Sequence, residues 1–313
     1  MRPRVFIHTN HRQLVGAMVS AHSFRRGSRH ADQFDVAIIR HGDYPFFARH
    51  EGQLYLRAGA KLPWRNDDLQ SFTPLRFMPP ELMGYEGHAL IVDPDVFAVA
   101  DVWNLLSRDM GGKAILCRIQ DSRVKRTVRG AYESSVMLLD CARLTHWRAQ
   151  AQFEELFAFT RDYRRWIGLD YEDPATIGAL EPQWNDFDHL GPDTKLIHNT
   201  RRMTQPWKTG LPVDFLPVEN FPLFPPFGWL MTARRRLFGD YGLLGKYRRH
   251  PDPRQETLFW ALLRDALEAG TVSEAFLREE MERGHLRPDA LERIPAAPTV
   301  EAVLGDVEPR RAA

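Results

Sequence analysis

The first forty residues contain two short apolar runs separated by one segment with helical periodicity. This order constrains the fold more than any other feature. Residues 5–7 form an apolar run that ends in polar residues, and residues 34–39 form a second run. Between them, residues 13–24 place apolar side chains at helical spacing. A strand, a helix and a strand in succession predict a parallel βαβ unit. The carboxyl ends of such strands are where α/β folds bind ligands.

The rest of the chain continues this alternation. Apolar runs predict four further strands, over residues 89–92, 114–117, 135–139 and 195–197. Helical periods and start signals predict helices over residues 79–82, 102–106, 148–163, 257–268 and 272–282. Residues 41–72 are expected to form loops and short helices. The pattern predicts an α/β fold with a central, mostly parallel mixed sheet.

Length and charge set the expected organisation. A chain of 313 residues favours one large domain, or one domain with a smaller appendage. We expect an α/β domain over residues 1–212, an aromatic and Pro-rich connector with a helical extension over 213–294, and a disordered tail over 295–313. The balance of 42 Lys and Arg against 41 Asp and Glu argues against a general nucleic-acid binder.

Cysteines and hydropathy bear on location. Cys117 and Cys141 both lie in apolar runs, so they are interpreted as small buried hydrophobes rather than as a disulfide framework or a zinc site. A reducing cytoplasm fits two free thiols. The apolar run at the start is too short for a secretion signal, and no run reaches the roughly 20 residues that span a bilayer. We therefore expect a cytoplasmic protein, soluble or peripheral at the inner membrane surface.

Two carboxylates follow directly after the predicted strand 89–92. Asp93 and Asp95 can reach one divalent cation if the backbone turns between them, and Pro94 would stiffen that turn. Hard oxygen ligands suit Mg²⁺ or Mn²⁺. The alternative is a solvated turn with an Asx hydrogen bond. A second Asp-x-Asp pair, at residues 186–188, is expected in a polar loop.

One histidine is a candidate third ligand. His198 closes the apolar run at residues 195–197, and a neutral imidazole can complete a site begun by carboxylates. Arg201, Arg202 and Lys208 follow it, and basic side chains beside a cation suit a diphosphate leaving group, which gains negative charge as its bond breaks. The alternatives are a structural histidine and a solvated basic loop.

The order of these motifs resembles the retaining, nucleotide-sugar-dependent glycosyltransferases of family 8, which have the GT-A fold. The strand over residues 132–140 is similar to the family's F-N-S-G-V-M-L-I-D strand, and residues 180–185 are similar to its L-P-P-x-W-N motif. The matching segments are, in chain order, residues 5–11, 73–82, 90–106, 132–140, 180–185 and 198–207. The resemblance covers about residues 4 to 210.

This resemblance implies a metal-dependent hexosyltransferase. It implies that Mn²⁺ or Mg²⁺ bridges the diphosphate of a nucleotide sugar, a UDP-sugar by analogy, and that a glycan, a lipid-linked or a small-molecule acceptor receives the sugar with retention. The implied metal ligands are Asp93, Asp95 and His198. The implied donor-binding residues are Thr9, Asn10 and His11 near the base and ribose, Arg76 facing the diphosphate or sugar, and Pro94, Gln205 and Lys208.

The sequence departs from the family pattern at several places. Glu133 stands where the family has Asn, Ser135 where it has Gly, and Gln205 where it has Lys. Lys208 is expected to replace that missing cation. The family's D-Q-D segment is absent, and Asp170 is the candidate acceptor-side carboxylate, so Glu133 and Asp170 are the expected catalytic residues. The donor sugar and the stereochemical outcome remain open.

Two other classes of function stay open. One is a different metal-dependent enzyme acting on nucleotide diphosphates, such as a nucleotidyltransferase or a hydrolase. The other is a catalytically silent relative that binds a nucleotide sugar without turnover, which the substitution at Glu133 and the missing D-Q-D keep open.

The region after residue 212 lies outside the resemblance and carries a basic and aromatic cluster. Its members are Arg234, Arg235, Arg236, Lys246, Arg248 and Arg249, with Trp229, Phe238, Tyr241 and Tyr247 between them. Such a cluster can hold a protein on an anionic membrane leaflet. The alternative is a solvated helix face whose aromatic side chains turn into the core.

Overall fold

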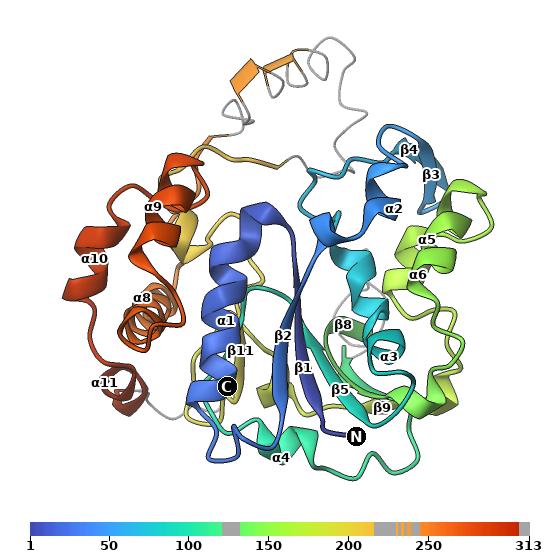
Figure 1. The fold of residues 1–313 in the computed structure, drawn as a ribbon, viewed down its shortest axis with the longest axis horizontal. Coiled ribbons are helices and arrows are strands. Elements are labelled where there is room, and N and C mark those ends of the chain that lie inside the picture. The colour runs from blue at the N-terminus through green and yellow to red at the C-terminus, as the bar shows by residue number, and fades with distance from the viewer. Residues whose placement is uncertain (121–131, 216–229, 231–232, 235–236, 239–244, 307–313) are drawn as a thin grey trace.

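A six-stranded mixed sheet lies at the centre of the computed structural model (Figure 1), which describes residues 1–120, 132–215, 230, 233–234, 237–238 and 245–306. The strand order is β2-β1-β5-β8-β7-β9. Their bounds are β1 Arg4–Thr9, β2 Asp35–Arg40, β5 His88–Val92, β7 Ile115–Ile119, β8 Tyr132–Asp140 and β9 Ile177–Ala179. β1 pairs in parallel with β2 and β5, β9 pairs in parallel with β7, and β8 is antiparallel to both of its neighbours. The predicted α/β fold with a mostly parallel mixed sheet is confirmed.

The predicted βαβ unit forms as expected, with helix α1 (Leu14–Arg26) between β1 and β2. Successive side chains of a strand point to opposite faces of a sheet. Val5 and Ile7 therefore pack in one core cluster together with Ala17 and Phe24, whereas Phe6 packs in another cluster on the opposite face. Residues 89–92 of β5 alternate between the same two clusters, so both faces of this strand are buried. This explains why the run 89–92 is apolar at every position.

The second face of the sheet is covered by α5 (Ala149–Phe157), α6 (Tyr163–Ile167), the short helices α2 (Pro45–Ala48) and α3 (Pro79–Leu82), and the hairpin β3–β4. The prediction of one helix over residues 148–163 is wrong. Phe159 has a φ of 61°, which an α-helix cannot continue through, and Asp162 starts α6 by accepting from two backbone N–H groups.

The segment 41–72 contains more regular structure than expected. Strands β3 (Leu54–Arg57) and β4 (Ala60–Pro63) pair as a short antiparallel hairpin. Ala58 and Gly59, the two residues between them, both have positive φ, as tight hairpin turns require.

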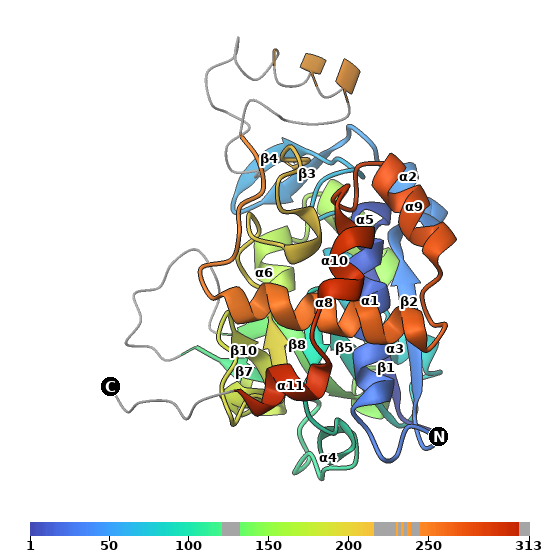
Figure 2. The same cartoon turned by 90° about the vertical axis from the view of Figure 1, so that its left-hand side faces the viewer.

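Four C-terminal helices pack on the outer side of α1 (Figures 1 and 2). They are α8 (Pro253–Glu268), α9 (Glu274–Glu282), α10 (Ala290–Ala296) and α11 (Val300–Gly305). Asp265 of α8 accepts from His22 Nε2 at 2.6 Å and from Arg26 Nε at 2.9 Å, both on α1. Helix α1 is therefore buried between the sheet and α8, and the extension continues the core of the α/β domain.

The expected disordered tail is wrong as far as residue 306. Val300 and Val303 of α11 are buried in the core cluster that α8 and α1 share. Thr299 caps α11 by accepting from the N–H of Ala302. A segment of six residues, of which only Val300 and Val303 are buried, gives a weak helical signal in the sequence, so packing rather than propensity decides this element.

A small second sheet lies at one end of the molecule, in the order β10-β11-β6. Its strands are β6 (Val96–Ala98), β10 (Asp186–Phe187) and β11 (Leu196–His198). β11 runs antiparallel to β6, which places His198 opposite Val96. The prediction of a polar loop around residues 186–188 is wrong, because Asp186 and Phe187 pair with β11.

The expectations about location depended on membrane-spanning segments and on the two cysteines. The described part of the chain holds no helix that combines the length and the apolar character needed to cross a bilayer. Cys117 and Cys141 are both buried, and burial raises the pKa of each thiol to about 12.

The basic and aromatic cluster is described only in part. Arg235, Arg236, Trp229 and Tyr241 lie outside the described residues, as does most of the Pro-rich connector. Phe238 is 66% exposed, with the Arg234 guanidinium 5.1 Å from its ring centre. Tyr247 is buried instead, so this aromatic side chain belongs to the core.

Candidate metal centre and its cavity

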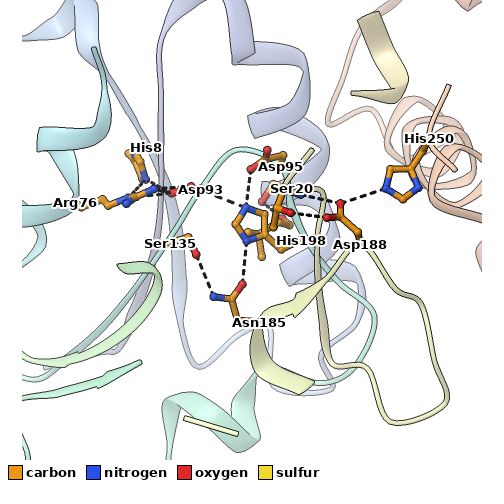
Figure 3. Close-up of polar contacts among 12 residues, drawn as sticks. His8, Ser20, Arg76, Asp93, Asp95, Ser135, Asn185, Asp188, His198 and His250 are labelled. Atoms are coloured by element: carbon orange, nitrogen blue, oxygen red, sulfur yellow. Dashed lines mark hydrogen bonds and ion pairs between the residues drawn. The ribbon is translucent and has the colours of Figure 1, made fainter. Parts of the chain in front are cut away.

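Asp93, Asp95 and His198 converge on one point (Figure 3). Each offers one ligand atom, and these atoms lie within 4.8 Å of one another. His198 Nε2 is 3.4 Å from Asp95 Oδ1 and 4.0 Å from Asp93 Oδ2. The structure therefore brings together two acids and an imidazole that lie a hundred residues apart in the chain. That they bind a cation remains a prediction.

The turn between the two acids is held from several sides. Asp93 N–H donates to the carbonyl of Ser135 on β8 at 3.0 Å, and the carbonyl of Asp95 accepts from the N–H of Asn199 at 3.1 Å. Gly16 of α1 allows the helix to pack closely here, because a Cβ at this position would lie 2.8 Å from the Pro94 carbonyl and from the Trp207 ring. The carboxylates are therefore held by β5, β8 and α1 together.

His198 is oriented by Asn185. The Asn185 amide donates through Nδ2 to Ser135 Oγ at 3.0 Å, so its Oδ1 accepts from His198 Nδ1–H at 3.0 Å. This hydrogen bond leaves Nε2 facing the two carboxylates, which is the arrangement of a ligand imidazole. Burial lowers the pKa of His198, but Asp95 and Asp93 together raise it above its ordinary value. Asn185 belongs to the segment 180–185, which is similar to the family's L-P-P-x-W-N motif, but the sequence analysis assigned it no role.

Asn185→Leu is expected to weaken Mn²⁺ binding about 10- to 100-fold, because the imidazole loses the partner that fixes its ring and tautomer. Isothermal titration with Mn²⁺ measures the change. Asn104→Leu, at an exposed position on helix α4 (Trp103–Leu106), is the matched control and should leave the Kd unchanged. Equal affinity in Asn185→Leu and wild type would contradict this role.

Asp93 has strong partners of its own within the described structure. Arg76 Nη2 donates to both of its oxygens at 2.6 Å, and His8 Nε2 donates to Oδ1 at 2.7 Å. Burial would raise the pKa of Asp93, but Arg76 and His8 hold it well below its usual range. Asp93 is therefore ionised. The sequence analysis predicted Arg76 as a donor-binding residue and assigned no role to His8, the first polar residue after the apolar run at residues 5–7.

The donor atoms fit a divalent cation of the Mn²⁺ or Mg²⁺ type. Two carboxylates and one imidazole supply oxygen and nitrogen ligands, and the partner of the imidazole fixes its second nitrogen. Such a cation would polarise a phosphate oxygen and stabilise the charge that develops on a leaving diphosphate.

An open cavity of about 150 Å³ lies over this site. Among the candidate site residues named from sequence, those on its wall are Arg76, Asp93, Pro94, Asp95, Glu133, His198, Arg202 and Gln205. The cavity is larger than a single ion requires, so it leaves room for further ligand atoms beside a cation. Glu133 also accepts a hydrogen bond from Gln120.

Several predicted residues lie away from this cavity. Thr9 and Asn10 are buried, and the Asn10 side chain caps the turn that leads into α1. His11 stacks edge-on against His285, at 5.4 Å between ring centres, and does not line the cavity. Asp170 is exposed and is also absent from the wall. The expected contacts of these residues with the donor or acceptor find no support in their positions.

Lys208 does not replace the missing family cation. Its side chain is fully buried, and its Nζ donates to Asp214 Oδ2 at 2.5 Å. Burial would raise the pKa of Asp214, but Lys208, Tyr247 and Arg12 lower it to about 2. Lys208 is therefore the partner of a buried carboxylate, and the cationic side chains on the cavity wall are Arg76, Arg164 and Arg202.

Two glutamines at the cavity carry buried amide atoms without a partner among the described residues; Gln205 was named from sequence, and Gln13 was not. Gln13 is 1% exposed and lines the cavity, and neither atom of its side-chain amide has a partner within the described residues. Gln205 Oε1 is also buried and has no hydrogen-bond partner within the described residues. Because unpaired buried amides cost free energy, these atoms are suited to hydrogen bonds with a bound molecule. A glutamine at the start of a helix gives no such signal in sequence.

The C-terminal extension reaches the site through His250. Its Nδ1 accepts from the N–H of Asp252 at 3.0 Å, so Nε2–H donates to Asp188 Oδ1 at 3.2 Å. Asp188 in turn accepts from the N–H of Thr200 at 2.9 Å and from its hydroxyl. Thr200 lines the cavity, so Asp188, in the second Asp-x-Asp pair, holds the segment after His198 (Figure 3).

Comparison with known proteins finds similarity in structure but not in sequence. No protein-family model matches the chain, and no curated protein matches it. Solved glycosyltransferases have a similar fold: the galactosyltransferase LgtC, with a TM-score of 0.45 and 12% identity, covers 65% of this chain and 89% of its own. GlyE of Streptococcus pneumoniae TIGR4 has a TM-score of 0.47 and 11% identity over 87% of this chain, which spans 64% of GlyE. Mouse xyloside xylosyltransferase 1 has a TM-score of 0.40 and 12% identity, over 63% of this chain and 97% of its own. At these values the similarities by themselves establish no activity for this chain.

Proposed function

We propose that this chain is a metal-dependent glycosyltransferase of GT-A type that transfers a hexose from a nucleoside diphosphate sugar, a UDP-sugar by the sequence resemblance. The observation that supports this most is the convergence of Asp93, Asp95 and His198 beside an open cavity with three arginines on its wall. A cation and arginines together match the charge that a departing diphosphate develops.

Different side chains would bind the cation, the phosphates and the sugar. Asp95 and His198 hold the cation, and Arg76 and Arg202 meet phosphate oxygens from the cavity wall. Gln13 and Gln205 present their unpaired amide atoms to polar groups of the donor. Glu133 lies on the same wall and accepts from hydroxyls of a bound sugar, which an ionised carboxylate can do without donating in return.

The reaction outcome and the acceptor follow from the resemblance alone. Retention of configuration is proposed on that ground, and the acceptor class is a glycan, a lipid-linked sugar or a small molecule. Contact with a membrane surface through Arg234, Phe238 and the exposed Arg248 and Arg249 also remains a proposal, as does a cytoplasmic location. Co-sedimentation with anionic vesicles tests that contact, and a protein that stays in the supernatant argues against it.

An assay of nucleotide release separates the proposed function from its rivals. The full chain is incubated with Mn²⁺ and a panel of nucleoside diphosphate sugars, with and without mixed acceptors, and free nucleoside diphosphate is measured. Release of UDP with transfer to an acceptor is the expected result. Binding without release under all conditions favours a silent relative, and cleavage of nucleotide diphosphates that carry no sugar favours another metal-dependent enzyme.

A further inference from the structure

Arg76 and a divalent cation need the same carboxylate. Arg76 donates to Asp93 Oδ1 from Nε at 3.0 Å and from Nη2 at 2.6 Å, and to Oδ2 from Nη2 at 2.6 Å. Oδ2 is the oxygen nearer to His198 Nε2, at 4.0 Å, and Arg76 already occupies it. Asp95, by contrast, faces His198 Nε2 at 3.4 Å and has no arginine ion pair among the described residues.

We propose that Arg76 competes with the cation for Asp93, so that Asp95 and His198 form the primary cation site and Asp93 joins it when Arg76 turns to an anionic ligand. A guanidinium that contacts both oxygens of a carboxylate is a strong partner, which a cation must displace to gain that ligand. The inference rests on the proposed function for one point, namely that the anion is a nucleoside diphosphate.

The surroundings of Arg76 allow such a change of partner. Its side chain is 12% exposed and lines the cavity, so a phosphate entering the cavity meets the guanidinium directly. Nη1 donates to Ser134 Oγ at 2.9 Å, a neutral contact that can persist while Nη2 and Nε move to phosphate oxygens. His8 continues to donate to Asp93 from β1 and keeps the carboxylate in place.

Binding of Mn²⁺ alone to the full chain tests this competition. Free Mn²⁺ is measured by electron paramagnetic resonance for wild type, Arg76→Leu, Arg76→Lys and Arg202→Leu. Arg76→Leu should bind Mn²⁺ at least tenfold more tightly than wild type. Arg76→Lys keeps the charge but loses the planar guanidinium that donates to both oxygens of Asp93. Its Kd for Mn²⁺ should lie between those of wild type and Arg76→Leu. Arg202→Leu removes one positive charge from the same cavity wall and should change the Kd by less than threefold.

Each other result overturns the inference. Equal or weaker binding in Arg76→Leu shows that Arg76 supports the cation site, and equal tightening in Arg202→Leu shows a general effect of charge. If Arg76→Leu fails to fold, the comparison of Arg76→Lys with wild type decides, and a Kd no tighter than that of wild type counts against the proposal. No Mn²⁺ binding by any variant contradicts both the inference and the metal-dependent function.

A second arm distinguishes this inference from the proposed function. UDP should tighten Mn²⁺ binding by a larger factor in wild type than in Arg76→Leu, because the variant has no arginine to be drawn away. Tight binding of Mn²⁺ by Arg76→Leu, without any sugar transfer by wild type, supports the competition and contradicts the transferase. Sugar transfer by wild type with unchanged Mn²⁺ binding in Arg76→Leu supports the transferase and contradicts the competition.

Discussion

Asp95→Asn is expected to reduce release of nucleoside diphosphate from the donor at least about 1000-fold, because bound metal ions contribute several kcal/mol to stabilising charge in the transition state. Asp95 is the carboxylate nearest to His198, and its 3.4 Å separation from Nε2 suits two ligands of one ion. Asparagine keeps the shape and loses the charge. The measurement is the initial rate of UDP release with saturating Mn²⁺.

The control for this prediction must separate charge at the site from charge elsewhere. Asp32→Asn changes an exposed carboxylate in the loop before β2 and should leave the rate within twofold of wild type. Circular dichroism should show both variants folded. A rate for Asp95→Asn within tenfold of wild type would mean that the reaction does not depend on a cation at this place.

Asp214→Asn is expected to destabilise the fold by about 3–5 kcal/mol, which is the usual effect of removing one partner from a buried ion pair. Lys208 is fully buried and has Asp214 at 2.5 Å, so the substitution leaves an ammonium group without its counter-charge. Arg12, whose Nη1 lies 3.7 Å from Oδ2, loses an ion pair at the same time, and one side-chain oxygen is left to accept from Lys208 and Tyr247. Urea unfolding measures the free-energy difference at pH 7.

The pH dependence of this loss gives a second check. The pKa of Asp214 lies at about 2, below its ordinary value of 3.8, so its contribution to stability is present above about pH 4 and is lost as the pH falls toward 2. The stability difference between wild type and Asp214→Asn should therefore shrink in that window.

Two comparison variants complete the test of the pair. Combining Lys208→Met with Asp214→Leu removes both charges and should recover most of the loss, because well-packed apolar residues often replace a buried pair at little cost. Glu274→Gln, in an exposed pair with Arg278 on α9, should cost less than about 0.5 kcal/mol. An effect of Asp214→Asn as small as that of Glu274→Gln would contradict the account of the pair.

The sequence singled out the three side chains that the structure brings together because their signals are local. Asp93 and Asp95 follow an unbroken apolar strand, and His198 closes another, so their places at strand ends could be inferred. That the three side chains would converge was predicted from the resemblance, which rests on the order of the motifs along the chain. The sheet supports this order, since β1, β5 and β8 meet beside the cavity.

Some errors concern the direction of side chains, and others concern single elements, namely those in residues 148–163, 186–188 and 295–306. Lys208 follows His198 closely in sequence, yet it turns into the core toward Asp214, and no local pattern encodes that pairing. Gln13 precedes an amphipathic helix and reaches the cavity only because Gly16 lets α1 pack closely against the Asp-x-Asp turn. The break at Phe159 and the order of α11 are also decided by tertiary packing, which overrides a weak helical period.

Pulsed electron paramagnetic resonance of the Mn²⁺-loaded chain tests the central claim most directly, because it detects nitrogen bound to the ion. The account predicts a coupling to one imidazole nitrogen that disappears in His198→Gln and persists in His30→Gln, a half-exposed histidine beside Asp101. A spectrum of bound Mn²⁺ with no nitrogen coupling, or a coupling that persists in His198→Gln, would contradict a shared ion between Asp93, Asp95 and His198.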